Sequence, residues 1–271
     1  MSTFWTSLCD AAHQDFIDLI GGLIRTTDGW AVDDDLAGEA KTLAEIFCPL
    51  LGPLPADRPL VVGHLAQSLD GCIAQADGES HWISGEADLD HTHRLRAFCD
   101  AVLVGAETVA RDDCQLTVRR VEGPHPIRVV LDPHARLTTE RKMFQVAEGS
   151  TIWVMGEESA PKEGLNTTVE VVYLPCKDGI FELGALMQLL QQRGCRRVFV
   201  EGGGVTISHF LQAGLLDRLH IAMAPVLIGG GRPTMGRALG ETLADCPRPA
   251  VRVHSMGHDW LFDCDFRSKS S

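Results

Sequence analysis

Residues 197–206 read RVFVEGGGVT, an apolar run that ends in an acid and is followed at once by three glycines. The run predicts a buried strand, and the residues after the glycines predict the start of a helix. Glycine lets a chain approach a ligand closely, and unpaired N–H groups at a helix start attract phosphate. We expect a phosphorylated cofactor here, with Glu201 at its edge; the alternative is an ordinary tight turn between a strand and a helix.

Strand and helix patterns alternate on both sides of this stretch. The pattern indicates an α/β fold with a mostly parallel central sheet, helices on both faces and an antiparallel C-terminal hairpin. Strands are predicted at 60–65, 101–104, 127–131, 151–155, 169–174, 197–200 and 219–224, helices at 86–98, 183–192 and 205–213, and the hairpin at 251–256 and 260–266.

The first part of the chain follows a different pattern. Residues 11–24 have the spacing of an amphipathic helix, and a second helix is expected to begin at 33–35 and run through Ile46. Prolines from Pro49 onward predict a linker. We therefore divide the chain into a helical appendage with its linker, residues 1–57, and a domain at 58–271.

Composition narrows the kind of partner and the compartment. The chain has 271 residues, 45% of them hydrophobic, and a net charge of −13, which argues against nucleic acid or an anionic membrane as the main partner. Nine cysteines are scattered without a C-x-x-C pair, which is typical of reduced thiols in a cytoplasmic protein. No signal peptide or membrane-spanning run is evident.

Three further segments carry candidate binding residues. Ser80 is suited to a phosphate or hydroxyl, and Trp82 to stacking on a planar ring, although an ordinary hairpin with a packed tryptophan explains the same pattern. Arg96 and Arg119 flank a predicted buried strand and are candidates for bidentate phosphate contacts, the alternative being solvated surface arginines. No metal site is expected, because His91 and His93 are two apart on a predicted helix and no zinc deaminase motif occurs.

Taken in order, these segments resemble the reductase domain of riboflavin biosynthesis, a family with a dihydrofolate-reductase-like fold that often forms half of a bifunctional deaminase/reductase. The resemblance covers about residues 58–267 and does not extend to a deaminase half. Its motifs are Ser68-Leu69-Asp70-Gly71, Gly78-Glu79-Ser80 with Trp82-Ile83, Arg94-Leu95-Arg96, Gly105 with Thr108, Asp112-Asp113, Leu116-Thr117-Val118-Arg119, Val200-Glu201-Gly202-Gly203, and Ala224-Pro225 with Gly229-Gly230.

This resemblance implies an NADPH-dependent reductase that converts a ribosylamino-pyrimidine 5′-phosphate to its ribitylamino form, in a family that is commonly dimeric. The implied substrate-binding residues are Ser80, Arg96, Leu116, Arg119 and Glu201. The implied cofactor-binding residues are Ala66, Trp82, Thr108, Asp112, Gly203, Gly204, Val205, Thr206, Ile207, Ser208 and His209. Glu201 and Asp70 are the acids expected near the reacting carbon.

Two residues depart from the family pattern. Cys114 replaces a usual proline after the paired aspartates, and Pro133 stands where a serine often lies near the cofactor's 2′-phosphate. Two other functions remain open: a reductase of a different pyrimidine, a pterin or dihydrofolate, and a non-catalytic binding protein of the same fold.

Overall fold

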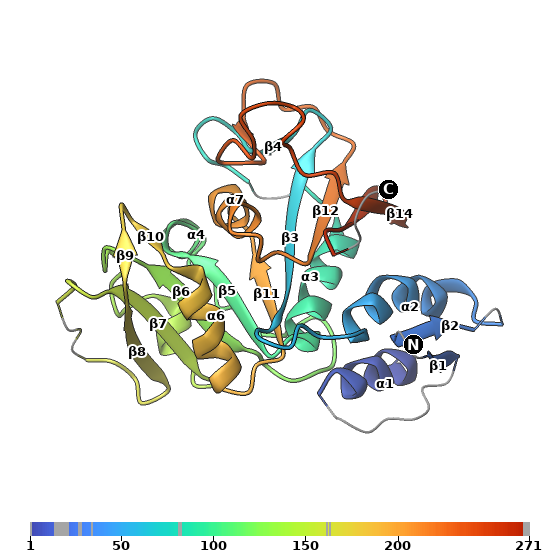
Figure 1. Cartoon of the computed structure of the whole chain (residues 1–271), viewed down its shortest axis with the longest axis horizontal. Helices are drawn as coiled ribbons and strands as arrows, with labels where there is room; N and C mark the ends of the chain where they lie inside the picture. Colours follow the sequence, from blue (N-terminus) through green and yellow to red (C-terminus); the bar gives the residue numbers. More distant parts are fainter. Residues whose placement is uncertain are drawn as a thin grey trace.

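A nine-stranded sheet forms the centre of the computed structural model, which describes residues 2–13, 22–26, 29–33, 35–80, 83–160, 162 and 164–267 (Figure 1). The spatial order of its strands is β14 (Ala250–Met256), β15 (Asp259–Asp265), β12 (Arg218–Ala224), β3 (Leu60–Ser68), β11 (Arg197–Glu201), β5 (Ala101–Gly105), β6 (Ile127–Asp132), β7 (Thr151–Gly156) and β8 (Val169–Leu174). Strands β12 to β8 are parallel, whereas β15 is antiparallel to both of its neighbours. The predicted parallel sheet and C-terminal hairpin are therefore confirmed.

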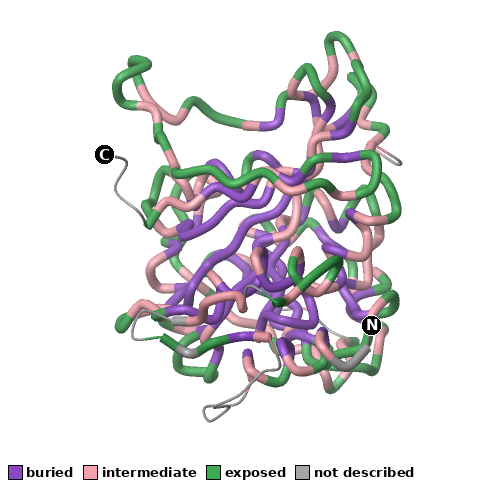
Figure 2. The backbone as a smooth tube through the Cα atoms, turned by 90° about the vertical axis from the view of Figure 1, so that its right-hand side faces the viewer, coloured by how far each residue is buried: buried purple, intermediate pink, exposed green. Residues whose placement is uncertain are grey.

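Helices cover both faces of the sheet, as the alternating sequence pattern predicts. Successive strand residues point to opposite faces, so Leu60 and Val62 of β3 enter one core, and Val61 and Leu65 enter the other. Helices α1, α2, α3, α4 and α5 contribute to the first core, and α6 and α7 to the second. Figure 2 shows the buried strands between these layers. The helices are α1 (Ser2–His13), α2 (Gly38–Leu51), α3 (Glu86–Phe98), α4 (Ala106–Asp112), α5 (Lys142–Gln145), α6 (Leu183–Gln192) and α7 (Gly204–Gln212).

Three short antiparallel pairs of strands lie outside the main sheet. They are β1 (Leu23–Thr26) with β2 (Gly29–Val32), β4 (Cys72–Ala74) with β13 (Arg232–Pro233), and β9 (Cys176–Lys177) with β10 (Ile180–Phe181). Both β4–β13 and β9–β10 follow the carboxyl ends of sheet strands, so they extend the edge where open α/β sheets bind ligands.

The N-terminal region differs from its prediction. The expected helix at 11–24 is wrong at its end, because Leu23 begins β1; α1 runs from Ser2 to His13, and residues 14–21 lie outside the described ranges. Pro49, expected to open the linker, lies inside α2. It falls in the last turn, where it removes one helical hydrogen bond, and the buried side chain of Leu50 keeps that turn packed.

The N-terminal segment shares a hydrophobic core with the rest of the molecule. The ring of Trp5 meets Phe47 edge to face at 5.2 Å, and Phe47 lies 5.1 Å from Phe98 of α3. The buried Arg197 donates from Nε to the Leu50 carbonyl at 2.8 Å and from Nη1 to the Ala12 carbonyl at 2.7 Å. One guanidinium thus satisfies the carboxyl ends of both α1 and α2. The boundary at residues 57 and 58 stays a prediction.

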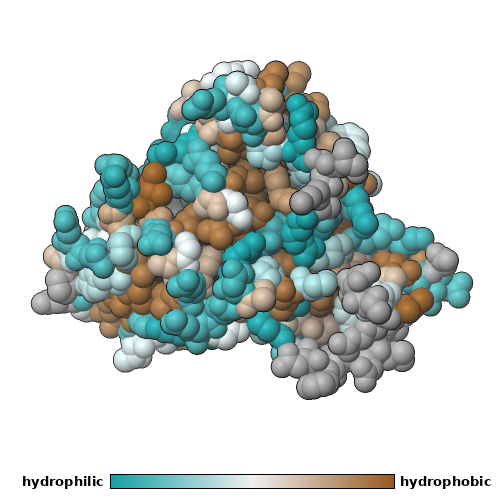
Figure 3. Space-filling model, viewed as in Figure 1, coloured by the Kyte–Doolittle hydropathy of each residue, from teal (hydrophilic) through white to brown (hydrophobic). Residues whose placement is uncertain are grey.

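The face seen in Figure 1 has an apolar centre. Figure 3 shows hydrophilic residues around its margins and hydrophobic residues gathered at its centre. Val205, on the first turn of α7, is 51% exposed. Exposed apolar surface of this kind often marks a binding region. Within the described ranges, no helix is long and apolar enough to cross a membrane.

Histidine 13 provides a pH-dependent link between α1 and the sheet. Its Nδ1 lies 3.3 Å from Asp100 Oδ1, and this hydrogen-bonded pair raises the pKa of His13 to about 10. A raised pKa stabilises the fold fully below the ordinary value of 6.5, and this stabilisation is lost as the pH rises through about 10.

The His13–Asp100 contact yields a prediction for stability. In the wild-type protein, the free energy of unfolding should fall between pH 6.5 and 10 as His13 loses its proton. We expect His13→Gln to lack this fall in chemical-denaturation measurements. Replacement of the exposed His258 by Gln is the control, and an unchanged pH slope in His13→Gln would contradict the assignment.

Candidate active site

The glycine stretch forms a sharp turn from β11 into α7. Gly202 and Gly203 have φ angles of 65° and 72°, in the left-handed region that side chains disfavour. A Cβ at Gly204 would lie 1.9 Å from the Thr234 carbonyl oxygen, so only glycine fits there. The structure thus contains both features that the sequence pattern predicts, a tight turn after the strand and a helix that begins directly after two glycines. The two interpretations are compatible.

Two helix starts lie side by side at this turn. A Cβ at Gly203 would be 3.5 Å from the Thr108 hydroxyl of α4, and a Cβ at Gly105 would be 3.0 Å from the Thr206 hydroxyl of α7. The first N–H groups of a helix have no partner inside it and carry partial positive charge. Two hydroxyls and two helix starts therefore converge on one small backbone-lined space, which suits a diphosphate.

Asp70 organises the loop that closes over α7. Its carboxylate accepts from the Ser68 hydroxyl at 2.6 Å, from the Ile228 amide at 3.1 Å and from the Gly229 amide at 2.7 Å. The Ser68 bond and these amides lower the pKa of Asp70 to about 2. An ionised carboxylate that already accepts three hydrogen bonds is suited to holding a loop in place rather than to donating a proton.

A buried ion pair joins α3 to the end of β11. Arg96 donates from Nε to Glu201 Oε2 at 2.7 Å and from Nη2 to Oε1 at 2.5 Å, while Nη1 donates to the Thr117 carbonyl at 3.0 Å. Burial disfavours the Arg96 charge, but attraction to Glu201 outweighs burial and raises the pKa of Arg96. The structure thus pairs two predicted substrate residues with each other, so Arg96 acts here as the partner of Glu201.

His93 connects this ion pair to the loop that carries Arg119. Its Nδ1 accepts from the Arg119 backbone N–H at 3.0 Å, so the ring proton of the neutral form lies on Nε2. That nitrogen is 3.4 Å from Arg96 Nη1, which is also a donor, so this contact is not a favourable hydrogen bond. Burial, with the charges of Arg96 and Arg119, lowers the pKa of His93 to about 4. A neutral His93 therefore fixes the loop.

Cationic side chains border the open side of the site. The exposed Arg119 donates to Thr117 Oγ1 at 2.5 Å and to Gln115 Oε1 at 3.2 Å. Both acceptors are neutral, so these two bonds do not neutralise the charge of Arg119. A Cβ at Gly78 would lie 2.5 Å from Arg111 Nη1 and 3.1 Å from Arg232 Nη2. Ser80, half-buried, follows two residues later. Sequence reasoning missed Arg111 and Arg232, because no distinct motif marks either of them.

The remaining predicted residues take varied places. Ala66 is half-buried on β3, Thr108 is half-buried on α4, and Asp112 is exposed at the end of α4. Leu116 has a φ of 56° and a buried side chain, which leaves its backbone as the part able to meet a ligand. Trp82 lies outside the described residues.

Along α7, the predicted cofactor residues divide by exposure. Val205 is exposed and Thr206 is half-buried at the open end of the helix, whereas Ile207 is buried in the second core. Ser208 is also buried and donates to the Gly204 carbonyl at 2.6 Å. Burial lowers the pKa of the half-buried His209. Of this segment, Gly203, Val205 and Thr206 are thus accessible to a ligand, whereas Gly204 is buried against the Thr234 carbonyl.

A second polar network lies beneath the site. His64 Nε2 is 2.8 Å from Asp88 Oδ1, and Ser84 donates to the other Asp88 oxygen at 2.6 Å. His91 Nε2 lies 3.0 Å from His220 Nδ1, so His91 and His93 do point to different neighbours, as expected from their spacing. Within the described ranges, no group of three or more His, Cys, Asp or Glu side chains is arranged to hold a metal ion.

Comparison with known proteins places the chain among riboflavin-pathway reductases. Residues 59–252 match the family model of the RibD C-terminal domain. The 2,5-diamino-6-ribosylamino-4(3H)-pyrimidinone 5′-phosphate reductase of Methanothermobacter thermautotrophicus is 40% identical over 216 residues, which cover 76% of this chain and 97% of that protein. The riboflavin biosynthesis protein RibD of Aquifex aeolicus is 34% identical over 71% of this chain and 53% of its own length.

A solved structure gives the same result for the fold. The diaminohydroxyphosphoribosylaminopyrimidine deaminase/5-amino-6-(5-phosphoribosylamino)uracil reductase from Thermotoga maritima superposes with a TM-score of 0.69 at 29% identity, over 84% of this chain and 61% of that one. The fold that the sequence resemblance implies is confirmed by this likeness. The chain spans nearly the whole archaeal reductase but only about three-fifths of the deaminase/reductase.

The Arg96–Glu201 pair yields a stability prediction. Removing one partner strands the other charge, so Glu201→Gln should lower the free energy of unfolding by about 3 kcal/mol. Replacing both residues, as Arg96→Met with Glu201→Leu, should cost less than the sum of the single changes, because neither charge is left unpaired. Arg193→Gln, which breaks an exposed pair with Glu170, is the control and should cost less than about 1 kcal/mol. Additive losses in the double variant, measured by urea denaturation, would contradict the coupling.

Proposed function

Because the chain belongs to the RibD C-terminal domain family, we propose that it is a reductase of riboflavin biosynthesis that acts on a ribosylamino-pyrimidine 5′-phosphate. The observation that carries the proposal is the junction at the end of β11. There, a glycine turn suited to a diphosphate directly follows Glu201, which Arg96 holds through two hydrogen bonds. One short segment thus joins a cofactor cradle to a polar group for the substrate.

The residues present fit a reduced nicotinamide dinucleotide. A Cβ at Gly203 would lie 3.5 Å from the Thr108 hydroxyl and 3.6 Å from the Thr206 hydroxyl, so the glycine leaves both hydroxyls accessible beside the turn. The exposed Val205 offers an apolar contact next to this cradle. When bound, the dinucleotide supplies a hydride. The family resemblance implies NADPH for this role.

On the substrate side, the proposed roles follow from charge. Arg119 and Ser80 bind the 5′-phosphate, because Arg119 is an exposed cation whose hydrogen bonds leave donors free. Glu201 accepts from sugar hydroxyls or ring N–H groups, while Arg96 holds its carboxylate in one orientation through two hydrogen bonds. Asp70 holds the 228–229 loop against the site. Hydride transfer requires close positioning and exclusion of water rather than a nucleophilic triad, and these residues supply the positioning.

We also propose that the chain forms a homodimer. The C-terminal hairpin ends the sheet, and it exposes Val251, Val253 and Trp260 by 49%, 54% and 45%. An exposed edge strand with apolar side chains favours pairing with another chain. Light scattering on the purified protein should give twice the monomer mass, and Val253→Lys should shift it toward the monomer. A monomeric wild-type protein would contradict this assembly.

The activity test compares substrates and hydride donors. Purified protein should oxidise NADPH or NADH in the presence of the ribosylamino-pyrimidine 5′-phosphate, measured as loss of absorbance at the nicotinamide band. Dihydrofolate is assayed in parallel. Turnover of dihydrofolate alone would favour the alternative reductase, and failure to bind either dinucleotide would favour a non-catalytic protein of the same fold.

Arg119 gives a sharper test of the phosphate site. Arg119→Gln should raise KM for the phosphorylated substrate by roughly ten- to a hundredfold, since hydrogen bonds to charged groups contribute ~1.5–3 kcal/mol. The value of kcat should change much less. Arg120→Gln is the matched control, because Arg120 is occupied by Glu86 and Asp90. Equal effects of the two substitutions would show that Arg119 has no special contact with the phosphate.

A further inference from the structure

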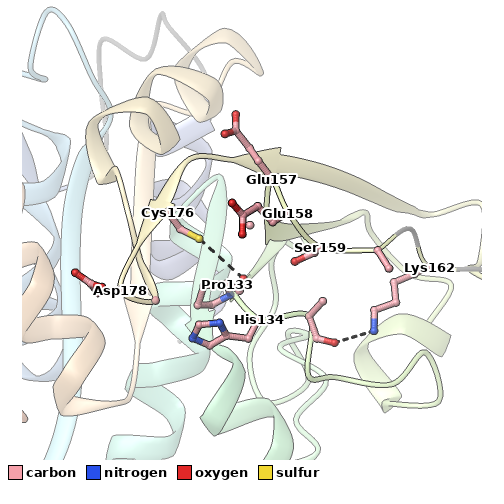
Figure 4. Close-up of a pocket in the computed structure, with 12 residues that line it drawn as sticks. Pro133, His134, Glu157, Glu158, Ser159, Lys162, Cys176 and Asp178 are labelled. Atoms are coloured by element: carbon pink, nitrogen blue, oxygen red, sulfur yellow. Dashed lines mark hydrogen bonds between the residues drawn. The ribbon is translucent and has the colours of Figure 1, made fainter.

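A cavity of about 690 Å³ lies beyond the carboxyl ends of β6 and β7 (Figure 4). Its walls come from residues 133–135 after β6, from residues 156–160 and Lys162 at the end of β7 and beyond it, and from the β9–β10 turn with Cys176 and Asp178. The ring of His134 packs against this turn, since a Cβ at Gly179 would lie 2.8 Å from its Nε2. The volume is in the range of small-molecule sites and is ample for a nucleoside.

The cavity lies on the same sheet edge as the glycine cradle. Strands β11, β5, β6 and β7 are consecutive neighbours and parallel, so their carboxyl ends form one row. Three strand spacings separate β11 from β7, which is roughly 14–15 Å. A dinucleotide consists of two nucleosides joined by a diphosphate. Its diphosphate at Gly203 and its second nucleoside in this cavity would follow the row of strand ends.

The charges that line the cavity are mainly negative. Figure 4 shows the Glu158 carboxylate between Glu157 and Pro133, directed into the cavity, while Asp178 stands at the opposite rim. The described lining residues include no arginine. A carboxylate readily accepts hydrogen bonds from a ribose diol, as acids at strand ends do in dinucleotide sites, whereas arginines accommodate a 2′-phosphate.

The one lysine of the described lining is committed to the protein itself. Lys162 Nζ donates to the Ala135 carbonyl at 2.8 Å and to the Leu137 carbonyl at 3.2 Å, and it lies 5.3 Å from the centre of the Trp153 ring. The dashed contact in Figure 4 shows the ammonium group turned to this loop. Its charge therefore stabilises the 135–137 loop instead of meeting a ligand phosphate in the middle of the cavity.

We propose that Glu158 is a specificity-determining residue that binds the ribose hydroxyls of the dinucleotide and selects NADH over NADPH. The inference rests on the proposed function in that it takes a nicotinamide dinucleotide as the ligand. A 2′-phosphate carries about −1.5 to −2 charges at neutral pH, and it would face Glu158 in a described lining that holds no arginine; the exposed Arg136 follows the lining residues 133–135 but is not among them. Pro133 also disfavours NADPH, because the proline side chain has no donor for a hydrogen bond to the 2′-phosphate.

Binding without substrate tests this proposal. Calorimetric titration of the full chain with NADH and with NADPH should give a Kd for NADH at least about tenfold lower than the Kd for NADPH. Glu158→Gln should reduce this ratio of the two Kd values several-fold, and Glu158→Arg should reverse the preference. Glu182→Gln, an exposed acid outside the cavity, is the control and should leave the ratio unchanged. Added salt should narrow the ratio in the wild-type protein, because exposed charges are screened.

Two outcomes would overturn the proposal. Tighter binding of NADPH by the wild-type protein is one, and an NADH preference that Glu158→Gln and Glu158→Arg both leave intact is the other. Competition by adenosine 5′-monophosphate and by adenosine 2′,5′-bisphosphate gives a second readout, in which the first should displace bound NADH at lower concentration. NADH binding without turnover of any pyrimidine phosphate would refute the proposed reaction while leaving this selectivity in place. Failure of both dinucleotides to bind would refute both.

Discussion

The ion pair between Arg96 and Glu201 is the interaction on which the arrangement of the site depends. It ties α3 to the last residue of β11, immediately before the glycine turn, and its third hydrogen bond reaches the Thr117 carbonyl. One guanidinium therefore fixes a helix, a strand end and a loop relative to each other. Burial, with the charge of Arg96, lowers the pKa of His93, and neutral His93 in turn holds the backbone of Arg119 on the same loop. Three segments are thus positioned around one buried cation.

Helix α3 is unusual because it faces the sheet with polar side chains. Asp88, His91 and Arg96 are all buried against strands, and the strand residues that receive them are polar as well. His64 is in register with Glu201 on one side and with His220 on the other, so the receiving groups form a row across three parallel strands. Hydrogen bonds from α3 reach His64, His220 and Glu201 in this row, while the second ring nitrogen of His220, Nε2, has no hydrogen-bond partner among the described residues and lies 3.3 Å from Asp263 Oδ1. Such a layer tolerates less sliding of the helix than an apolar interface would, because each bond has one geometry.

Local patterns were enough to predict the sheet, the hairpin and the bounds of α3 and α6, because their apolar spacing agrees with their environment. Pairing across 105 residues has no local signature, so Arg96 and Glu201 were predicted as site residues without any indication that they bind each other. His93 was missed for a related reason. It accepts a hydrogen bond from a backbone N–H, and no sequence pattern distinguishes such a histidine from one on the surface. The β1–β2 hairpin was missed because Leu23 and Ile24 fit the helical spacing of the residues before them. The two glycines that precede Leu23 weaken that helical pattern but do not by themselves predict its end. The placement of the substrate and cofactor residues stays a prediction, since their ligands define them.

The contact between Arg197 and the Ala12 carbonyl has a consequence for synthesis of the chain. The two residues are separated by 185 positions, and Arg197 also binds the end of α2. At ordinary translation rates of about 5–20 residues per second, the first helices therefore wait roughly 10 to 40 s for their anchor to leave the ribosome. During that interval the apolar surfaces of Trp5 and Phe47 lack the β11 side of their core. Helices α1 and α2 are thus made well before the strand that secures them, and their apolar faces stay partly uncovered until β11 is synthesised.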